Sequence, residues 1–463
     1  MQKLFDEVSS LDKRCYEKYA LSEDVLMEHA ANGMAQYICS KCEVESKVLI
    51  ICGSGNNGAD GMALARLLHL NFDVWVYLAK TPTSKMALLQ LQRMRSIGVR
   101  ESATVIPCDV VVDAYVGSGF RGNFDKNTEE LMKKLNALNA LKIACDVPSG
   151  LKINAIPIKN TFLADVTLTM GALKKFLFLD AAKDYVGDIK LINLGLPREV
   201  YEKSSNWKLL DKEDMKLPFR NKKDSHKGNF GHLGVILGEK KGAGIMSAKT
   251  ALRFGTGLVT LIGFSDDAIP DSLMSSQILP SNTTALALGM GLGDIFSKKE
   301  LSAFLDNKLA LVADADIFYM PEILEILKRE KLVLTPHPKE FVALLNLTKI
   351  AKISVDTLQE NRFKYTEIFC QKYPKVTLLL KGANVVIGKK NRFFINAHGT
   401  SVLAKAGSGD VLSGLIGALL AQGHECLDAA ICASLAHTSL AQNYAGANFS
   451  LTAEDLIAGI GNL

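Results

Sequence analysis

The sequence predicts an α/β protein of two domains, each built on a largely parallel β-sheet with helices on both faces. The chain has 463 residues, of which 48% are apolar, and this length is too great for a single hydrophobic core. Short apolar segments alternate with segments of helical periodicity, which is the rhythm of βαβ units. A polar segment at 204–227 interrupts that rhythm once and therefore separates two α/β runs.

The first run begins with a helical stretch at about 22–40 and continues as apolar strands separated by helices. The predicted strands are 47–52 ("KVLIIC"), 74–79 ("VWVYLA"), 110–116 ("VVVDAYV"), 142–150 ("KIACDVPSG") and 164–170 ("ADVTLTM"). Helices are expected at 61–70 and 128–140. Near-continuous apolar strands of this kind are typical of a parallel sheet that is buried on both faces. We therefore expect a first domain, a three-layer sandwich, over residues 1–205.

The second run shows the same alternation over residues 217–463. Its predicted strand segments are 230–238 ("FGHLGVILG"), 257–264 ("GLVTLIGF"), 283–293 ("TTALALGMGLG"), 309–318 ("LALVADADIF"), 331–338 ("KLVLTPHP") and 376–388 ("VTLLLKGANVVIG"). Two helices, at 407–423 and 427–444, close the run. The two runs share no motif at a common period, so the sequence predicts two different α/β domains rather than a repeat.

The charge pattern excludes several classes of protein. The net charge of +5 results from 54 basic and 49 acidic residues spread along the chain, which is not the clustered basic surface of a nucleic-acid binder. The N-terminus is too polar for a signal peptide, and no apolar run approaches the ~18 residues of a membrane span. We expect a cytoplasmic homo-oligomer that binds neither nucleic acid nor membranes.

A glycine-rich turn follows the first strand of the first domain. Its three glycines, Gly53, Gly55 and Gly58, fit the G-x-G-x-x-G fingerprint, whose amides can bind an anion at a helix N-terminus. A dinucleotide site also needs an acidic residue at the end of the second strand, and this strand ends in Ala79 and Lys80. Hydride transfer with bound NAD is therefore disfavoured.

Two further loops leave strands at the same edge of the predicted sheet, where ligands of open α/β sheets collect. Together the three loops supply Asn57, Asp113 and Ser149, whose oxygen atoms suit an alkali or alkaline-earth cation. The alternative is that Asp113 and the nearby Asp146 merely cap helices.

These motifs resemble a known family. "GSGNNGADG", "DAYVGSGFRG" and "DVPSG" look like the Rossmann-like epimerase domain of the NAD(P)H-hydrate repair enzymes, although Ala59 stands where the family has a glycine. The resemblance implies potassium at Asn57, Asp113 and Ser149. It implies substrate contacts from Asn56, Asn57, Gly58, Ala59, Asp60, Gly117, Ser118, Gly119, Phe120, Arg121, Gly122, Asn123 and Asp146.

The second domain is similar to the ribokinase-like dehydratase of the same family, through "GMGLG", "TPHPKE", "LLLKGANVVI" and "AKAGSGDVLSGLIGALLAQG". This likeness implies ADP with Mg²⁺ as phosphoryl donor. It implies that hydrated cofactor is bound by Ala243, Gly291, Gly293, His337 and Asp410. The nucleotide contacts that it implies are Lys381, Gly382, Ala383, Asn384, Val385, Gly407, Ser408 and Gly409. Asn384 and Val385 replace a glycine and a threonine of the family, which puts one hydroxyl contact to the nucleotide in doubt.

The resemblance implies a two-step repair of NADHX and NADPHX, the hydrated forms of NADH and NADPH. Asp146 is the candidate proton shuttle for interconverting the R and S epimers at the hydroxylated ring carbon. Asp410 is the candidate base that takes the proton from the hydroxyl before its phosphorylation, which makes phosphate the leaving group. His437 is expected to be a core histidine, and Glu340 is expected either to hold magnesium waters or to cap a helix.

Two rival functions remain open at this point. A ribokinase-type small-molecule kinase would use the same Asp410 but leave the phosphate on its product. The first domain could instead be a nucleotide-binding scaffold without activity of its own.

Overall fold

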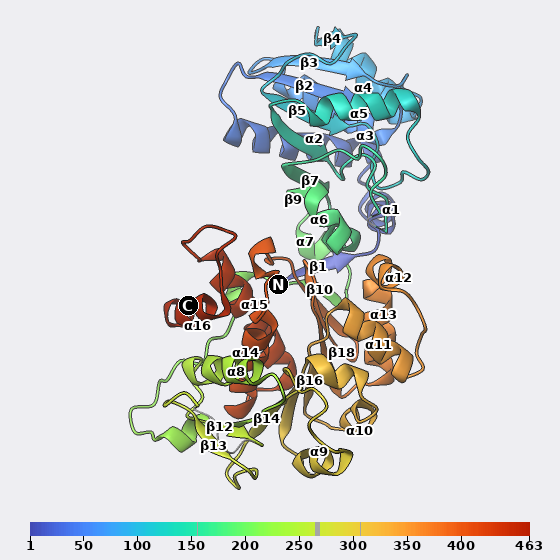
Figure 1. The fold of residues 1–463 in the computed structure, drawn as a ribbon. Helices are drawn as coiled ribbons and strands as arrows, with labels where there is room; N and C mark the ends of the chain where they lie inside the picture. The colour runs from blue at the N-terminus through green and yellow to red at the C-terminus, as the bar shows by residue number, and fades with distance from the viewer. Residues whose placement is uncertain (155, 264–268, 306) are drawn as a thin grey trace. The chain divides into compact units, whose positions relative to one another are not determined.

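The computed structural model describes residues 1–154, 156–263, 269–305 and 307–463 (Figure 1). The chain divides into two compact units, one formed by Lys3–Ser205 and the other by Asn206–Leu463 with Met1–Gln2. Each unit contains a mostly parallel sheet between helices, so the predicted α/β class with two sheets is confirmed.

The N-terminal unit is built on a seven-stranded sheet in the order β4-β3-β2-β5-β6-β7-β9, and every neighbouring pair is parallel. Its strands are β2 (Lys47–Cys52), β3 (Asp73–Leu78), β4 (Arg100–Ser102), β5 (Val110–Ala114), β6 (Leu141–Cys145), β7 (Val166–Met170) and β9 (Asp188–Ile192). Two short strands, β1 (Gln2–Phe5) and β8 (Leu173–Lys174), also pair in parallel.

Helices cover both faces of this sheet. They are α1 (Ser9–Tyr19), α2 (Glu23–Lys41), α3 (Asn56–Leu68), α4 (Lys85–Ser96), α5 (Lys126–Asn136), α6 (Lys183–Val186) and α7 (Arg198–Tyr201). Successive side chains of a strand point to opposite faces, so Val48 and Ile50 pack with α2, α3 and α4, whereas Leu49 and Ile51 pack with α5. The result is the predicted three-layer sandwich.

The C-terminal unit contains strands in the order β13-β12-β11-β14-β15-β16-β17-β18-β19-β10. Their bounds are β10 (Trp207–Leu209), β11 (His232–Ile236), β12 (Leu258–Ile262), β13 (Met274–Ser276), β14 (Ala285–Leu288), β15 (Ala310–Ala313), β16 (Leu332–Leu334), β17 (Val376–Leu380), β18 (Val385–Lys389) and β19 (Arg392–Asn396). The pairs β17–β18 and β18–β19 are antiparallel. The predicted strand segment 376–388 is thus a hairpin of β17 and β18 whose turn contains residues 381–384.

The helices of this unit are α8 (Lys241–Arg253), α9 (Lys298–Leu305), α10 (Ile323–Ile326), α11 (Pro338–Leu347), α12 (Val355–Glu360), α13 (Arg362–Lys372), α14 (Ser408–Ala421), α15 (Cys426–Gln442) and α16 (Ala453–Gly459). One large core joins α8, α14, α15 and α16 to one face of the sheet. Helix α13 packs on β17 and β18, and Figure 1 shows α11 and α13 on the side of the sheet away from α14.

The segment at 204–227, predicted to connect the domains, contributes to the C-terminal unit. Its strand β10 pairs with β19, and its Trp207 stacks on Phe393 with ring centroids 4.7 Å apart. The side chains of Trp207 and Leu210 are buried. A strand of three residues in a polar stretch is too short to show an alternating pattern of apolar and polar residues. Its partner strand lies almost 190 residues further along the chain, so no neighbouring segment indicates the pairing either.

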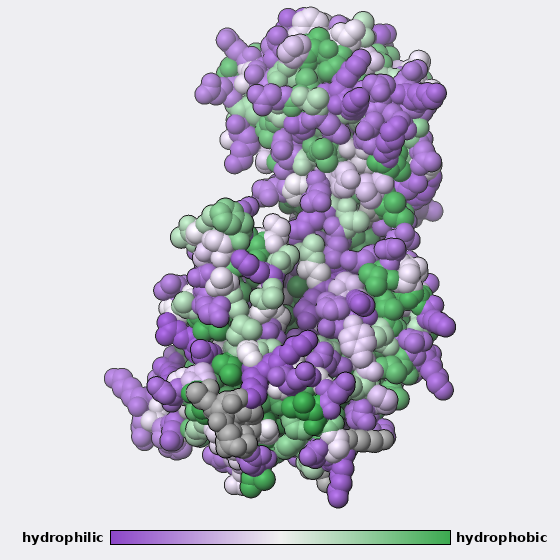
Figure 2. Space-filling view, viewed as in Figure 1, coloured by the Kyte–Doolittle hydropathy of each residue, from purple (hydrophilic) through white to green (hydrophobic). Residues whose placement is uncertain are grey.

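The surface seen in Figure 2 mixes hydrophilic residues with scattered hydrophobic ones over both units. Such single exposed apolar residues are normal on protein surfaces. Among the described residues, no helix has the length and apolar character that crossing a membrane requires.

Candidate functional site

A cavity of about 570 Å³ opens in the N-terminal unit at the carboxyl edge of its sheet. The turn after β2, the loop after β5 and Asp146 after β6 all line it, because parallel strands end at the same edge. The first helix and the segment before it contribute Asp6 and Asp12. The three loops expected to meet at this edge thus do so, and the N-terminal segment, which no motif indicates, joins them.

The glycine turn is built by close backbone packing. A Cβ atom at Gly53 would lie 1.9 Å from the carbonyl oxygen of Tyr115, and one at Gly58 would lie 2.1 Å from that of Gly53. Only glycine fits at these two positions. Gly55, by contrast, has no neighbouring atom within 4 Å of such a position and lines the cavity, so the α3 N-terminus is open to a ligand.

Asp146 is held by a buried ion pair. Its Oδ1 lies 2.5 Å from Nζ of Lys174, whose side chain is only 1% exposed, and accepts a second hydrogen bond from the amide of Met170 at 3.1 Å. The backbone of Asp146 is left-handed, with φ of 70°, which is uncommon for a residue with a side chain. The structure thus fixes this carboxylate at the wall of the cavity.

Asp113 is fully buried at the end of β5. Its carboxylate accepts hydrogen bonds from the amide and the hydroxyl of Ser149, at 2.7 and 2.6 Å. Among the described residues no cationic side chain pairs with it, and burial raises its pKa to about 6.

Asn57 lies beside the loop that follows β5. A Cβ atom placed at Gly117 of that loop would be 3.4 Å from the side-chain oxygen of Asn57. The hydroxyl of Ser149 also accepts from the amide of Val116 at 3.0 Å, so the loop after β5 touches both residues. A buried carboxylate without a cationic partner, next to neutral oxygen donors, fits a monovalent cation.

The predicted substrate residues divide into two groups. Those that line the cavity are Asn56, Asn57, Asp60, Gly117, Ser118, Gly119, Phe120, Arg121 and Asp146. The remaining four, Gly58, Ala59, Gly122 and Asn123, are not part of its lining, and Gly58 and Ala59 are buried in α3. Lys174, which no sequence motif indicates, also lines the cavity and follows β7, another strand that ends at this edge.

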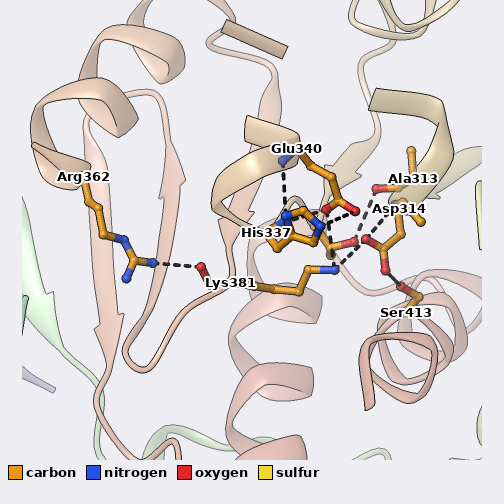
Figure 3. Close-up of polar contacts among 9 residues, drawn as sticks. Ala313, Asp314, His337, Glu340, Arg362, Lys381 and Ser413 are labelled. Atoms are coloured by element: carbon orange, nitrogen blue, oxygen red, sulfur yellow. Dashed lines mark hydrogen bonds and ion pairs between the residues drawn. The ribbon is translucent and has the colours of Figure 1, made fainter. Parts of the chain in front are cut away.

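A second cluster of polar side chains lies in the C-terminal unit, again where parallel strands end (Figure 3). Lys381, directly after β17, places its Nζ 2.8 Å from Oδ1 of Asp314, directly after β15. The other oxygen of Asp314 accepts a hydrogen bond from Ser413 of α14 at 2.8 Å. Burial opposes the charge of Lys381, but Asp314 and Glu340 nevertheless raise its pKa.

His337 and Glu340 form a capping box at the start of α11. Nδ1 of His337 accepts from the amide of Glu340 at 3.2 Å, and the Glu340 carboxylate accepts from the amide of His337 at 2.7 Å. The helix-capping prediction for Glu340 is thereby confirmed. Burial raises the pKa of Glu340 to about 7, and its carboxylate lies 3.9 Å from Nζ of Lys381.

The glycine loop 406–410 leads into α14. Gly407, with φ of 86°, is the N-cap and packs beside Met246 of α8. Asp410 lies in the first turn, where burial and the nearby Asp314 raise its pKa to about 6. A Cβ atom at Gly409 would lie 3.5 Å from Nζ of Lys381, so the loop and the lysine adjoin each other.

His437 of α15 is buried, as expected for a core histidine. Its Nε2 lies 3.1 Å from the hydroxyl of Ser408, the first residue of α14. Burial lowers the pKa of His437 to about 4, so the imidazole is neutral at physiological pH. The core position therefore also supports the glycine loop, a contact that helical periodicity alone does not reveal.

The other predicted residues of the second site lie on neighbouring loops. Ala243 lies in the first turn of α8 beside the loop after β14, where a Cβ atom at Gly291 would be 3.3 Å from that of Ala243. The amide of Gly293 donates to Asp316 at 3.0 Å. In the turn of the β17–β18 hairpin, Gly382 and Ala383 are exposed, whereas Asn384 is buried.

Within the described part of the chain, no group of three or more His, Cys, Asp or Glu side chains is arranged to hold a metal ion. Mg²⁺ commonly keeps several waters and binds through substrate phosphates with one or two carboxylates. Asp314 and Glu340, close to Lys381, fit that more limited role.

Comparison with known proteins gives a consistent result for both units. Residues 23–176 match the family model described as YjeF-related protein N-terminus, and residues 233–461 match the model described as NAD(P)H-hydrate dehydratase. A bifunctional NAD(P)H-hydrate repair enzyme of Dictyoglomus turgidum is 30% identical, with 98% of this chain and 96% of that protein covered.

Among solved structures, an ADP/ATP-dependent NAD(P)H-hydrate dehydratase from Bacillus subtilis, co-crystallized with ATP and Mg²⁺, is 25% identical. That match covers 52% of this chain and 92% of the other, with a TM-score of 0.46. The bifunctional NAD(P)H-hydrate repair enzyme of Helicobacter pylori is 43% identical over all of both chains. On this full-length identity, the chain belongs to the family of bifunctional NAD(P)H-hydrate repair enzymes.

Proposed function

We propose that this chain repairs hydrated nicotinamide cofactors in two steps. The N-terminal unit interconverts the R and S epimers of NADHX and NADPHX. The C-terminal unit dehydrates the S epimer to NADH or NADPH and converts ADP to AMP and phosphate. One observation carries the proposal: each unit has its own carboxylate, Asp146 or Asp410, at the loop edge of its own parallel sheet.

The epimerisation step needs a proton carrier beside the hydroxylated ring carbon. Asp146 is suited to it, because Lys174 orients its carboxylate at the cavity wall. The open glycine turn at Gly55, at the N-terminus of α3, would receive the phosphates of the damaged cofactor.

A potassium ion would be held by Asn57, Asp113 and Ser149. It would supply positive charge that balances the buried Asp113 and holds together the loops that follow β2, β5 and β6. These residues themselves position the cavity wall, since Ser149 bonds both Asp113 and the loop after β5.

The dehydration step must replace hydroxide, a poor leaving group. Asp410 would take the proton of the hydroxyl as its oxygen attacks the terminal phosphoryl group of ADP. The amides of Gly407, Ser408 and Gly409 at the start of α14, together with Lys381, would stabilise charge on that group. Magnesium carried by the nucleotide would supply further neutralisation of its phosphates.

The test is to incubate the protein with mixed epimers of NADPHX and either ADP or ATP. Recovery of the dihydronicotinamide absorbance, complete for both epimers and accompanied by free phosphate, is the expected result. A small-molecule kinase would instead leave the phosphate on its product. A scaffold-type first unit would leave the R epimer unrepaired except by slow spontaneous exchange.

A further inference from the structure

Asp60 is another of the acidic residues that line the epimerase cavity with Asp146. It projects from the first turns of α3, four residues after the helix begins. The residue is partly buried, and among the described residues none donates a hydrogen bond to its carboxyl group. A partly buried carboxyl group without a hydrogen-bond donor is less stable as a carboxylate than one that a donor or a cation contacts.

The ammonium group that acts on Asp60, that of Lys174, is already fully engaged. Nζ of Lys174 lies 2.5 Å from Asp146, 3.0 Å from the hydroxyl of Thr169 and 3.3 Å from the carbonyl of Met170. An ammonium group has three N–H bonds, so these acceptors use all of them. Lys174 therefore pairs with Asp146, and among the described residues no cationic side chain pairs with Asp60.

The charged groups around Asp60 also disfavour the ionised form of its carboxyl group. Burial, and then the charges of Asp146, Asp12 and Glu23, raise the pKa of Asp60 well above its ordinary value, while Lys174 acts weakly in the opposite direction. The titratable and charged groups around Asp60, from all the elements packed against it, are Asp12, Tyr16, Glu23, Cys52, Cys145, Asp146 and Lys174. Lys174 thus contacts one of these two carboxyl groups and not the other, and such a difference in environment is typical of an acid and base pair.

We propose that Asp60 is a second catalytic residue of the epimerase, the proton donor that works with Asp146 as proton acceptor. This inference rests on the proposed epimerase function. Asp60 donates its proton to the hydroxyl of the hydrated ring, and the carbon–oxygen bond breaks as the ring nitrogen forms a double bond to that carbon. Water is released. A water molecule then adds to the opposite face of the carbon, and Asp146 takes the proton that it loses.

The step conserves atoms and charge, with one proton moved from Asp60 to Asp146. In the reverse direction the two carboxyl groups exchange roles, and exchange with solvent restores the resting protonation. The scheme requires Asp60 protonated and Asp146 ionised at the same time. The rate must therefore fall as pH rises through the pKa of Asp60.

The first experiment measures kcat/KM of epimerisation by the full-length wild-type chain against pH, with the spontaneous rate subtracted. An alkaline decline is expected, and a rate that is flat up to the pH of unfolding overturns the proposal. In Asp60→Asn, kcat/KM should drop by about 10²- to 10⁴-fold and the alkaline decline should disappear. Asparagine matches the neutral acid in size, so the variant should unfold at nearly the wild-type temperature.

Asp12→Asn is the matched comparison. Asp12 lines the same cavity, but its Oδ1 accepts a hydrogen bond from the hydroxyl of Tyr201 at 2.7 Å. This variant should retain the alkaline decline. If Asp12→Asn loses the decline and Asp60→Asn keeps it, the donor is Asp12 and the proposal is wrong. A wild-type chain with no epimerisation at any pH would instead refute the proposed function itself.

Discussion

Nζ of Lys381 and Oδ1 of Asp314 are 2.8 Å apart, and this ion pair joins the ends of two strands to helix α14 through Ser413. Asp314 is only 2% exposed. Its Oδ1 also accepts a hydrogen bond from the amide of Ala315, a residue with a left-handed backbone, φ of 54°. The sequence motifs identify Lys381 but not its partner. Asp314 therefore orients Lys381, the lysine that we propose contacts the nucleotide.

Asp314→Asn should lower the free energy of unfolding of the C-terminal unit by about 3 kcal/mol. This is the lower end of the cost of breaking a buried ion pair, because the amide oxygen can still accept from Lys381. Ser413→Ala is the matched control, since it removes one hydrogen bond to the same carboxylate and should cost about 1 kcal/mol. Urea denaturation followed by circular dichroism measures both, and equal losses would contradict the ion-pair argument.

Asp410→Asn should abolish recovery of NADPH while epimer exchange continues. Loss of a positioned base costs about 10²- to 10⁴-fold in rate, and Asp410 is the carboxylate in the first turn of α14. Absorbance at the dihydronicotinamide band reports dehydration, and chromatographic separation of the epimers reports exchange. Near-normal dehydration by this variant would show that another group takes the hydroxyl proton.

Dehydration should also depend on pH through Asp410. Its pKa is raised to about 6, so the carboxylate form needed to accept a proton predominates only above that pH. The value of kcat/KM should therefore decline about tenfold per pH unit on the acid side of about pH 6. A profile that shows no decline down to pH 5 would exclude Asp410 as the base.

Sequence reasoning succeeds where a residue follows a recognisable strand. Asp113, Asp146 and Lys381 each come directly after, or at the end of, an apolar strand, and parallel geometry brings such ends to one edge. The same rule could have identified Asp314, which ends the segment 309–314, but no glycine motif marks it.

Other contacts are tertiary in origin and leave no periodic signal. Lys174 reaches Asp146 from 28 residues away through a two-residue strand, and Asp12 joins the cavity because α1 packs there. The hydrogen bond between Ser408 and His437 depends on how α14 and α15 pack. Element lengths and patterns predict the layers, but not which side chains of adjoining layers meet.

Asp146→Ala should have the converse effect to Asp410→Asn. With mixed epimers, the variant should recover NADPH quickly from the S epimer and then stall, because the two sites lie in separate units. In the alanine variant, Lys174 is left buried without its ion-pair partner. The structural control is therefore Asp146→Asn, whose amide oxygen can still accept a hydrogen bond from Lys174. Both should lose exchange, and loss of S-epimer repair in Asp146→Asn would contradict the division of labour.

Asp113→Ala tests the cation proposed between the loops of the N-terminal unit. The carboxylate of Asp113 is fully buried, and its hydrogen bonds come from Ser149 and from the amide of Tyr115. Its removal takes away the negative charge that would retain potassium, so epimerisation should slow and no longer respond to that ion. The measurement is the epimerisation rate against potassium concentration, with sodium keeping the ionic strength constant, for wild type and variant. Dehydration of the S epimer should be unaffected, and a wild-type rate that ignores potassium would refute the site.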